Sequence, residues 1–112
     1  MIKEIALKVF AALLHRKNQK WIQNPIKTQS QIFNQLIQKG LETKFGKDHY
    51  FKSITNTAEF REKVPVRDYE ELLPYVDRIL EGESDVLWPG RPMYYAKSSG
   101  TTDSRSKFIP VS

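Results

Sequence analysis

Apolar residues recur at helical spacing along much of the first 80 positions, and this periodicity restricts the fold more than any other feature. The first run advances in steps of three and one, over Ile2, Ile5, Ala6, Val9, Phe10, Leu13 and Leu14. Such spacing lays side chains along one face of a helix. Further apolar residues widen that face, at Leu7, Ala11 and Ala12. We therefore predict a first helix that begins at Ile2, can extend to Ile22 and has more than one packing partner.

Local signals predict where the next segments begin and end. Asn24 is a favourable capping residue and Pro25 a favourable first helical residue, so a second helix follows. That helix is predicted to end near Gly40, because glycine commonly follows a helix. The stretch 44–50 is predicted to be a turn around Gly46.

Two further helical segments are predicted before position 82. Asn56, with Glu59 three residues later, resembles a capping box that opens a short helix, and Pro65 stops it. A last helical period covers Tyr69, Leu72, Leu73, Val76, Ile79 and Leu80. Pro74 falls inside this period, so we expect either two short helices or a kink there.

The pattern changes after Gly82. Residues 93–97 and 108–111 are rich in aromatic and β-branched side chains, which predicts two strands. A short loop joins them, so they form a hairpin. The predicted fold class is mainly α with a carboxy-terminal β-hairpin, the helices at about 2–82 and the hairpin at about 93–111.

Length and composition narrow the classes of function. With 112 residues the chain suits one small domain. It has no cysteine, which excludes a disulfide framework, a thiolate zinc site and a cysteine nucleophile. Its two histidines fit none of the usual metal-ligand spacings, so no metal site is predicted. No segment approaches the roughly 20 apolar residues of a membrane span, and Glu4 and Lys8 interrupt the apolar start, so we predict a cytoplasmic protein without a signal peptide.

Charge is distributed unevenly along the chain. Residues 1–52 carry ten basic and three acidic side chains, a balance of +7, whereas residues 53–112 carry eight and ten, a balance of −2. A basic half is typical of a face for nucleic acid or an anionic membrane, so a free-standing basic helical binding module is an alternative hypothesis. The plainer interpretation is a solvated helix face. No sequence motif specifies nucleic acid.

A hydroxyl-rich loop between the predicted strands is the segment that most suggests chemistry. It opens with Ser98, Ser99, Gly100, Thr101 and Thr102. Glycine lets the backbone approach a ligand closely, and successive N–H groups in such a turn form an anion-binding nest. Lys107 follows the loop and supplies a point charge for phosphate. The Walker pattern is absent, and composition alone leaves two interpretations open: a polyphosphate loop or a solvated hairpin tip.

Several blocks of sequence, taken in order, resemble one enzyme family. Residues 95–111, which read Tyr-Ala-Lys-Ser-Ser-Gly-Thr-Thr and end in Ser-Lys-Phe-Ile-Pro-Val, resemble the first ATP motif of adenylate-forming enzymes. The upstream blocks 43–49, 64–70 and 82–90 are similar to the amino-terminal region of bacterial members of the auxin-responsive acyl-acid amido synthetase family. The resemblance covers the chain from about position 25 to its last residue.

This resemblance implies an enzyme that uses ATP and Mg²⁺ to convert a carboxylic acid into an acyl-adenylate with release of pyrophosphate. The acyl group then passes to an amine. Residues 1–112 would form the amino-terminal part of the large adenylation domain of a larger α/β enzyme. Because family members are several times longer, the resemblance implies that this chain is a fragment or truncated product and is not catalytic alone; the catalytic residues stay unknown.

The same resemblance assigns roles to individual loop residues. It implies that Ser98 and Ser99 donate hydrogen bonds to the ATP phosphates and that Gly100 supplies backbone freedom. Thr101 and Thr102 would be further donors. Lys107 would be the basic residue that closes the phosphate loop. The stretch 103–105, Asp-Ser-Arg, departs from the family pattern, in which glycine is common there.

Overall fold

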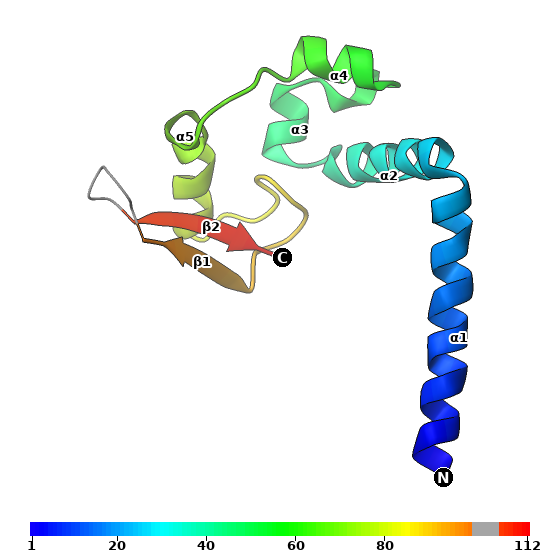
Figure 1. Ribbon diagram of the computed structural model, residues 1–112. Helices are drawn as coiled ribbons and strands as arrows, with labels where there is room; N and C mark the ends of the chain where they lie inside the picture. Colours follow the sequence, from blue (N-terminus) through cyan, green and yellow to red (C-terminus); the bar gives the residue numbers. More distant parts are fainter. Residues whose placement is uncertain (100–105) are drawn as a thin grey trace. The chain divides into compact units, whose positions relative to one another are not determined.

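The computed structural model describes residues 1–99 and 106–112 of the chain (Figure 1). The chain divides into two compact units, Met1–Phe33 and Asn34–Ser112. The predicted fold class is confirmed, because the described residues form helices followed by one carboxy-terminal antiparallel hairpin. None of the helices in these residues combines the length and the hydropathy that a membrane span requires.

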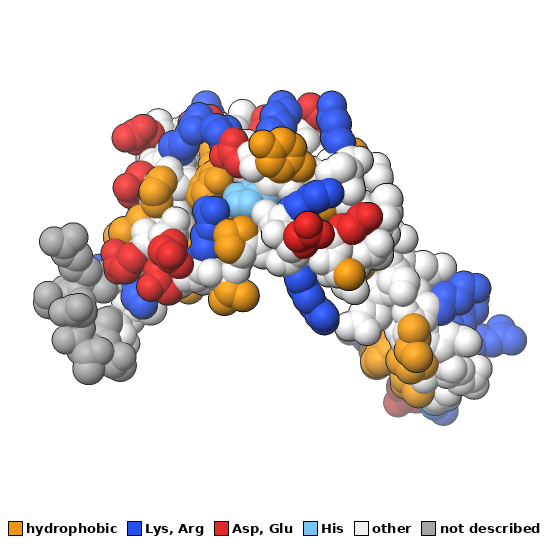
Figure 2. All heavy atoms as spheres, turned by 90° about the horizontal axis from the view of Figure 1, so that it is seen from above, with side chains coloured by type: hydrophobic (Ala, Val, Ile, Leu, Met, Phe, Trp, Pro, Cys, Tyr) orange, Lys and Arg blue, Asp and Glu red, His pale blue; other side chains and the backbone are white. Residues whose placement is uncertain are grey.

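The first unit holds α1 (Ile2–Gln23) and the beginning of α2 (Pro25–Gly40), separated by Asn24 alone. The predicted break at Asn24-Pro25 is thereby confirmed. Helix α1 buries none of its residues, and its large apolar side chains range in exposure from 44% at Leu14 to 85% at Ile2. The packing partners expected for α1 therefore do not lie within this unit. Figure 2 shows one face of the molecule, on which exposed hydrophobic side chains lie between charged ones.

The second unit begins within α2 and contains four further helical segments. These are α3 (Lys44–Asp48), the 3-10 helix η1 (Phe51–Ser53), α4 (Thr57–Lys63) and α5 (Tyr69–Leu80). The hairpin follows, with β1 (Tyr94–Ser98) and β2 (Lys107–Val111). The hydrophobic core is small and comprises Ile37, Phe51, Ile54, Val76, Ile79 and Val86. It therefore joins α2, η1, α5 and the loop that follows α5.

Helix α3 lies where the sequence predicted a turn, and that prediction is wrong. The Thr43 hydroxyl caps the helix by accepting a hydrogen bond from the Gly46 N–H at 3.0 Å. The Lys44 and Phe45 N–H groups donate to backbone carbonyls of residues 85 and 86, at 2.8 and 3.0 Å. The first N–H groups of a helix lack partners within the helix. Here distant carbonyls satisfy them, so tertiary contacts stabilise a five-residue helix.

Close backbone contact at two glycines brings α2, α3 and η1 together. A Cβ atom at Gly46 would lie 1.9 Å from the Gly40 carbonyl oxygen. A Cβ atom at Gly40 would lie 2.8 Å from the Phe51 ring. The Thr43 hydroxyl also donates to the Gly40 carbonyl, at 2.7 Å. These contacts require glycine at both positions.

The cap of α4 follows its predicted signal with one change, and α5 begins with a capping box that was not predicted. Asn56 accepts from the Glu59 N–H at 2.9 Å, as expected, but the Glu59 carboxylate accepts from the N–H and hydroxyl of Thr55 rather than from the capping residue. In α5 the box is complete and pairs Asp68 with Glu71. Helix α5 passes through Pro74 as one element, so of the two alternatives expected there, two short helices or a kink, the first is wrong.

We predict that Gly46→Ala destabilises the protein by about 3 kcal/mol, near the upper end of the usual cost of overpacking. The added methyl group would meet a backbone oxygen, which cannot move aside as a flexible side chain could. The midpoint of urea unfolding measures this loss. Lys47→Ala is the matched control: its exposed side chain pairs with Glu42 at 3.3 Å, and such pairs contribute about 0.5 kcal/mol. Equal midpoints for the two variants would contradict the close approach.

Candidate functional site

The register of the hairpin brings two of the predicted site residues together. Ser98, the last residue of β1, pairs with Lys107, the first residue of β2. Directly paired residues of antiparallel strands point to the same face of the sheet. Ser98 is half-buried, and Ser99 and Lys107 are exposed. The predicted site residues Gly100, Thr101 and Thr102 lie outside the described residues, as does the atypical stretch 103–105.

A second lysine of the hairpin occupies the other face of the sheet. Lys97 pairs with Phe108, one position along from the pair at the loop, and its ammonium lies 5.9 Å from the Phe108 ring centroid. Because side chains alternate between faces along a strand, Lys97 does not share a face with Ser98. Of the two lysines, Lys107 is therefore the one placed beside the loop hydroxyl.

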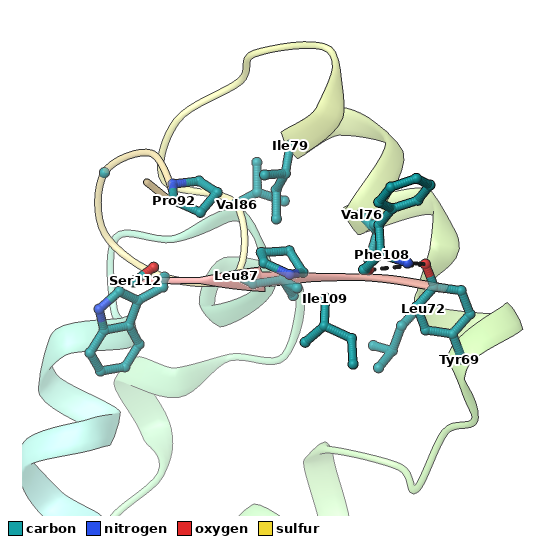
Figure 3. A pocket seen from close by; sticks show the side chains of 13 residues that line it. Tyr69, Leu72, Val76, Ile79, Val86, Leu87, Pro92, Phe108, Ile109 and Ser112 are labelled. Atoms are coloured by element: carbon teal, nitrogen blue, oxygen red, sulfur yellow. Dashed lines mark hydrogen bonds between the residues drawn. The ribbon is translucent and has the colours of Figure 1, made fainter. Parts of the chain in front are cut away.

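Tyr69, the first residue of α5, holds the start of β2. Its hydroxyl donates to the Phe108 carbonyl at 3.0 Å and accepts from the Phe108 N–H at 2.9 Å, as the dashed lines in Figure 3 show. The Lys107 ammonium lies 5.4 Å from the centroid of the same ring. No local signal indicates this role, because Tyr69 reads as one apolar position of a helical period and its partner is 39 residues away.

The outer edge of β2 is closed to a further strand. Backbone polar groups alternate in direction along a strand, so Phe108 and Pro110 present theirs to the same side. Tyr69 occupies both polar groups of Phe108, and Pro110 has no N–H to donate. A neighbouring strand could not form a regular hydrogen-bonded ladder along this edge of β2.

A cavity of about 230 Å³ lies between α5, the loop after α5 and β2 (Figure 3). Its walls are mostly apolar side chains, including Leu72, Val76, Ile79, Leu87, Trp88 and Ile109. The Tyr69 hydroxyl at its rim is already bonded to Phe108. Phosphate groups need hydrogen-bond donors or cations. The cavity is therefore suited to apolar groups rather than to phosphate.

The loop after α5 owes its shape to Asp85, which adopts a left-handed conformation with φ +56°. The Asp85 carboxylate accepts from the Gly90 N–H at 2.7 Å, and the Asp85 N–H donates to the Gly90 carbonyl at 3.0 Å. At the start of this loop Arg78 and Glu83 form two side-chain hydrogen bonds, at 2.6 and 2.8 Å. These contacts close the loop that leads into β1.

His49, the one histidine of the second unit, is a packing residue. It is 4% exposed, and its Nδ1 lies 2.8 Å from the Phe45 carbonyl. Its ring centroid is 4.0 Å from that of Phe45. Beside it Asp48 pairs with Lys44 and accepts from the Tyr75 hydroxyl at 2.9 Å. These contacts give His49 a structural role at the end of α3. Among residues 1–99 and 106–112, no group of three His, Cys, Asp or Glu side chains is arranged to hold a metal ion.

Comparison with known proteins shows the family to which the chain belongs. The model of the GH3 family N-terminal domain matches residues 14–112. The chain therefore belongs to the GH3 family. The match begins inside α1 and includes the whole hairpin.

Curated relatives are plant enzymes of greater length. The chain is 25% identical over 117 aligned residues to the indole-3-acetic acid-amido synthetase GH3.5 of Arabidopsis thaliana, covering 97% of this chain and 19% of that protein. It is 40% identical over 60 residues to a putative indole-3-acetic acid-amido synthetase, GH3.10, of Oryza sativa subsp. japonica. That alignment covers 53% of this chain and 13% of the rice protein. It is 26% identical over 85 residues to the jasmonoyl-L-amino acid synthetase JAR4 of Nicotiana attenuata. That alignment covers 75% of this chain and 15% of the relative. The chain thus spans a fifth or less of these relatives, and no solved structure matches it significantly.

We predict that Asp85 makes part of the stability depend on pH. The Gly90 N–H, and next the Ser84 hydroxyl, lower the pKa of Asp85 in the folded state. A lowered carboxyl pKa stabilises the fold above the unfolded-state pKa, near 3.9, and this contribution is lost as pH falls through the folded-state pKa. Asp85→Asn keeps an acceptor for Gly90 and tolerates the positive φ, but it cannot titrate.

Urea unfolding of both proteins at about pH 7 and about pH 3, on either side of the unfolded-state pKa, tests this prediction. The parent should lose more stability between the two conditions than Asp85→Asn does. Some acid sensitivity should persist in the variant, because hydrogen bonds from Lys44, Thr55 and Arg78 lower the pKa values of Asp48, Glu59 and Glu83. An identical loss in both proteins would contradict the role of Asp85.

Proposed function

We propose that the hairpin binds the phosphates of ATP in an acyl-acid amido synthetase that adenylates its acid substrate. The observation that carries the proposal is the pairing of Ser98 with Lys107, which puts a hydroxyl and a cation on one face at the base of the loop, within a GH3 family match. The names of the relatives, indole-3-acetic acid-amido and jasmonoyl-L-amino acid synthetases, describe the joining of an acid to an amine. We extend that reaction class to the protein of which this chain is a part.

The proposed reaction has two steps. A carboxylate oxygen attacks the α-phosphorus of ATP, the bond from that phosphorus to the bridging oxygen breaks, and pyrophosphate leaves. The amine nitrogen then attacks the acyl carbon, the carbon–oxygen bond to AMP breaks, and the nitrogen loses a proton. Activation is needed because AMP is a far better leaving group than an unactivated carboxylate oxygen.

The described residues fit an anionic group. The hydroxyls of Ser98 and Ser99 and the ammonium of Lys107 are donors, and charge-assisted hydrogen bonds to phosphate are stronger than neutral ones. Fixed donors of this kind stabilise charge that develops in the transition state. Gly100, Thr101 and Thr102 would complete the loop, and Mg²⁺ would enter with the nucleotide. The acyl and amine substrates would bind elsewhere in the larger enzyme.

The remaining features of the proposal concern the whole protein. We infer that these residues form the amino-terminal part of a larger adenylation domain, in a bacterial enzyme of the cytoplasm, and that the 112-residue chain alone is not catalytic. The intact mass of the protein in its source cells tests whether these residues belong to a larger domain. A mass near 13.1 kDa, that of the 112 residues alone, would contradict this inference.

We predict that Ser98→Ala, Ser99→Ala and Lys107→Met, made in the protein at its native length, each reduce ATP-dependent pyrophosphate exchange by about 10- to 100-fold, the cost of losing one hydrogen bond to a charged group. The assay is isotope exchange between pyrophosphate and ATP in the presence of the acid substrate. Ser30→Ala is the matched control, because the Ser30 hydroxyl bonds the Ile26 carbonyl within α2. Exchange equal to that of the parent in all three loop variants would overturn the proposal.

A further inference from the structure

We infer that Tyr69 is a positioning residue for the phosphate site, which it serves by holding Lys107 in the orientation that meets the nucleotide. This inference rests on the proposed function, because it takes Lys107 to be the cation that binds phosphate. Tyr69 itself touches no nucleotide in this scheme. It acts on the backbone that carries Lys107 and on the end of the Lys107 side chain.

The backbone contact determines where β2 begins. One hydroxyl bonds both the N–H and the carbonyl of Phe108, the residue that directly follows Lys107. It thereby takes the place that a neighbouring strand would occupy. A single hydroxyl that serves as donor and acceptor for one residue restrains both the position and the rotation of that peptide segment. The Lys107 Cα is therefore held relative to α5.

The start of α5, which carries Tyr69, is restrained as well. Tyr69 is the first residue of α5, and Asp68 before it caps the helix. Asp68 and Glu71 form a reciprocal pair, in which each side chain accepts from the other's backbone N–H at 2.9 and 3.0 Å. Because the helix start is restrained in this way, the half-buried Tyr69 ring projects from a rigid base.

The ring contact acts on the ammonium group. The Lys107 Nζ lies 5.4 Å from the Tyr69 ring centroid, within the range of a cation–π contact. Lysine has a flexible four-carbon stem, and restricting it before the ligand binds reduces the entropy lost on binding. A cation–π contact at an exposed site is weaker than a charge-assisted hydrogen bond to phosphate. The ring therefore orients the ammonium without competing with the nucleotide for it.

A double-mutant cycle in the protein at its native length tests the inference, with ATP titration and pyrophosphate exchange as readouts. Tyr69→Phe removes the hydroxyl and keeps the ring, and Tyr69→Leu removes both. We expect the Kd for ATP to rise about three- to tenfold in Tyr69→Phe and further in Tyr69→Leu, given typical hydrogen-bond and cation–π contributions. The KM for ATP should rise likewise, while the exchange rate at saturating ATP changes less than about twofold, since Tyr69 touches no reacting atom.

Coupling between the two positions separates positioning from general stability. In the Lys107→Met background, either Tyr69 substitution should change the Kd for ATP by less than about twofold, because the group through which Tyr69 acts is gone. Effects of Tyr69 that are as large in this background as in the parent would overturn the inference. A Tyr69→Phe variant that does not fold would overturn it as well, by showing a role in the fold alone.

Tyr95→Phe is the matched control. The Tyr95 hydroxyl donates to the Ile79 carbonyl at 3.3 Å, so it also fastens the hairpin to α5, but from β1 and without contact to Lys107. We expect its urea midpoint to fall about as far as that of Tyr69→Phe, with the Kd for ATP unchanged. A matching loss of ATP affinity in Tyr95→Phe would overturn the inference.

Failure of the proposed function would give other results in these variants than failure of the Tyr69 inference alone. If Lys107→Met binds ATP as the parent does, then Lys107 is no phosphate ligand, and the proposed site itself is wrong. If Lys107→Met weakens ATP binding but the effects of Tyr69 are independent of it, only the positioning role is wrong.

Discussion

Two backbone hydrogen bonds, from Lys44 and Phe45 to the carbonyls of Asp85 and Val86, join the start of α3 to the loop that follows α5. They satisfy N–H groups that a helix start leaves unpaired, and they restrain a loop that has no regular secondary structure of its own. Val86, at 1% exposure, anchors the same loop in the core. Since β1 emerges from this loop, the joint at α3 determines where the hairpin begins. The position of the candidate site depends on it.

The hairpin is held from both of its strands by tyrosine hydroxyls. Tyr69 reaches β2 from the first residue of α5, and Tyr95 reaches back from β1 to the Ile79 carbonyl near the end of α5. A two-stranded hairpin is marginally stable by itself, so these attachments to a helix are what make it a rigid support for a loop. The two tethers lie near opposite ends of one helix, which restrains the tilt of the hairpin as well as its distance from the helix.

Local signals were enough to predict most of the helices and both strands. Pro25 marks a helix start through its fixed backbone angle and Asn56 through its side-chain oxygen, and the sequence displays both directly. Helix α3 could not be predicted, because the carbonyls that satisfy its first N–H groups lie far downstream. The candidate loop was visible from composition, but the pairing of Ser98 with Lys107 was not predicted, because the predicted strands, 93–97 and 108–111, each stopped one residue short of it. The part played by Tyr69 was not visible, since nothing local distinguishes a tyrosine that packs from one that holds a strand.

The start of α5 lies beside the hairpin, yet it is poorly suited to phosphate. A free helix N-terminus attracts anions through its unpaired N–H groups and its dipole. Here the Asp68 carboxylate already accepts from the Glu71 N–H, the Glu71 carboxylate accepts from the Asp68 N–H, and both place negative charge at the helix start. Of the two lysines in the described strands, Lys107 is the one that brings favourable charge to the loop face, since Lys97 lies on the other face of the sheet. A flexible cation gains from a residue that orients it, and Tyr69, whose hydroxyl and ring act at Lys107 and its neighbour, is placed to do so.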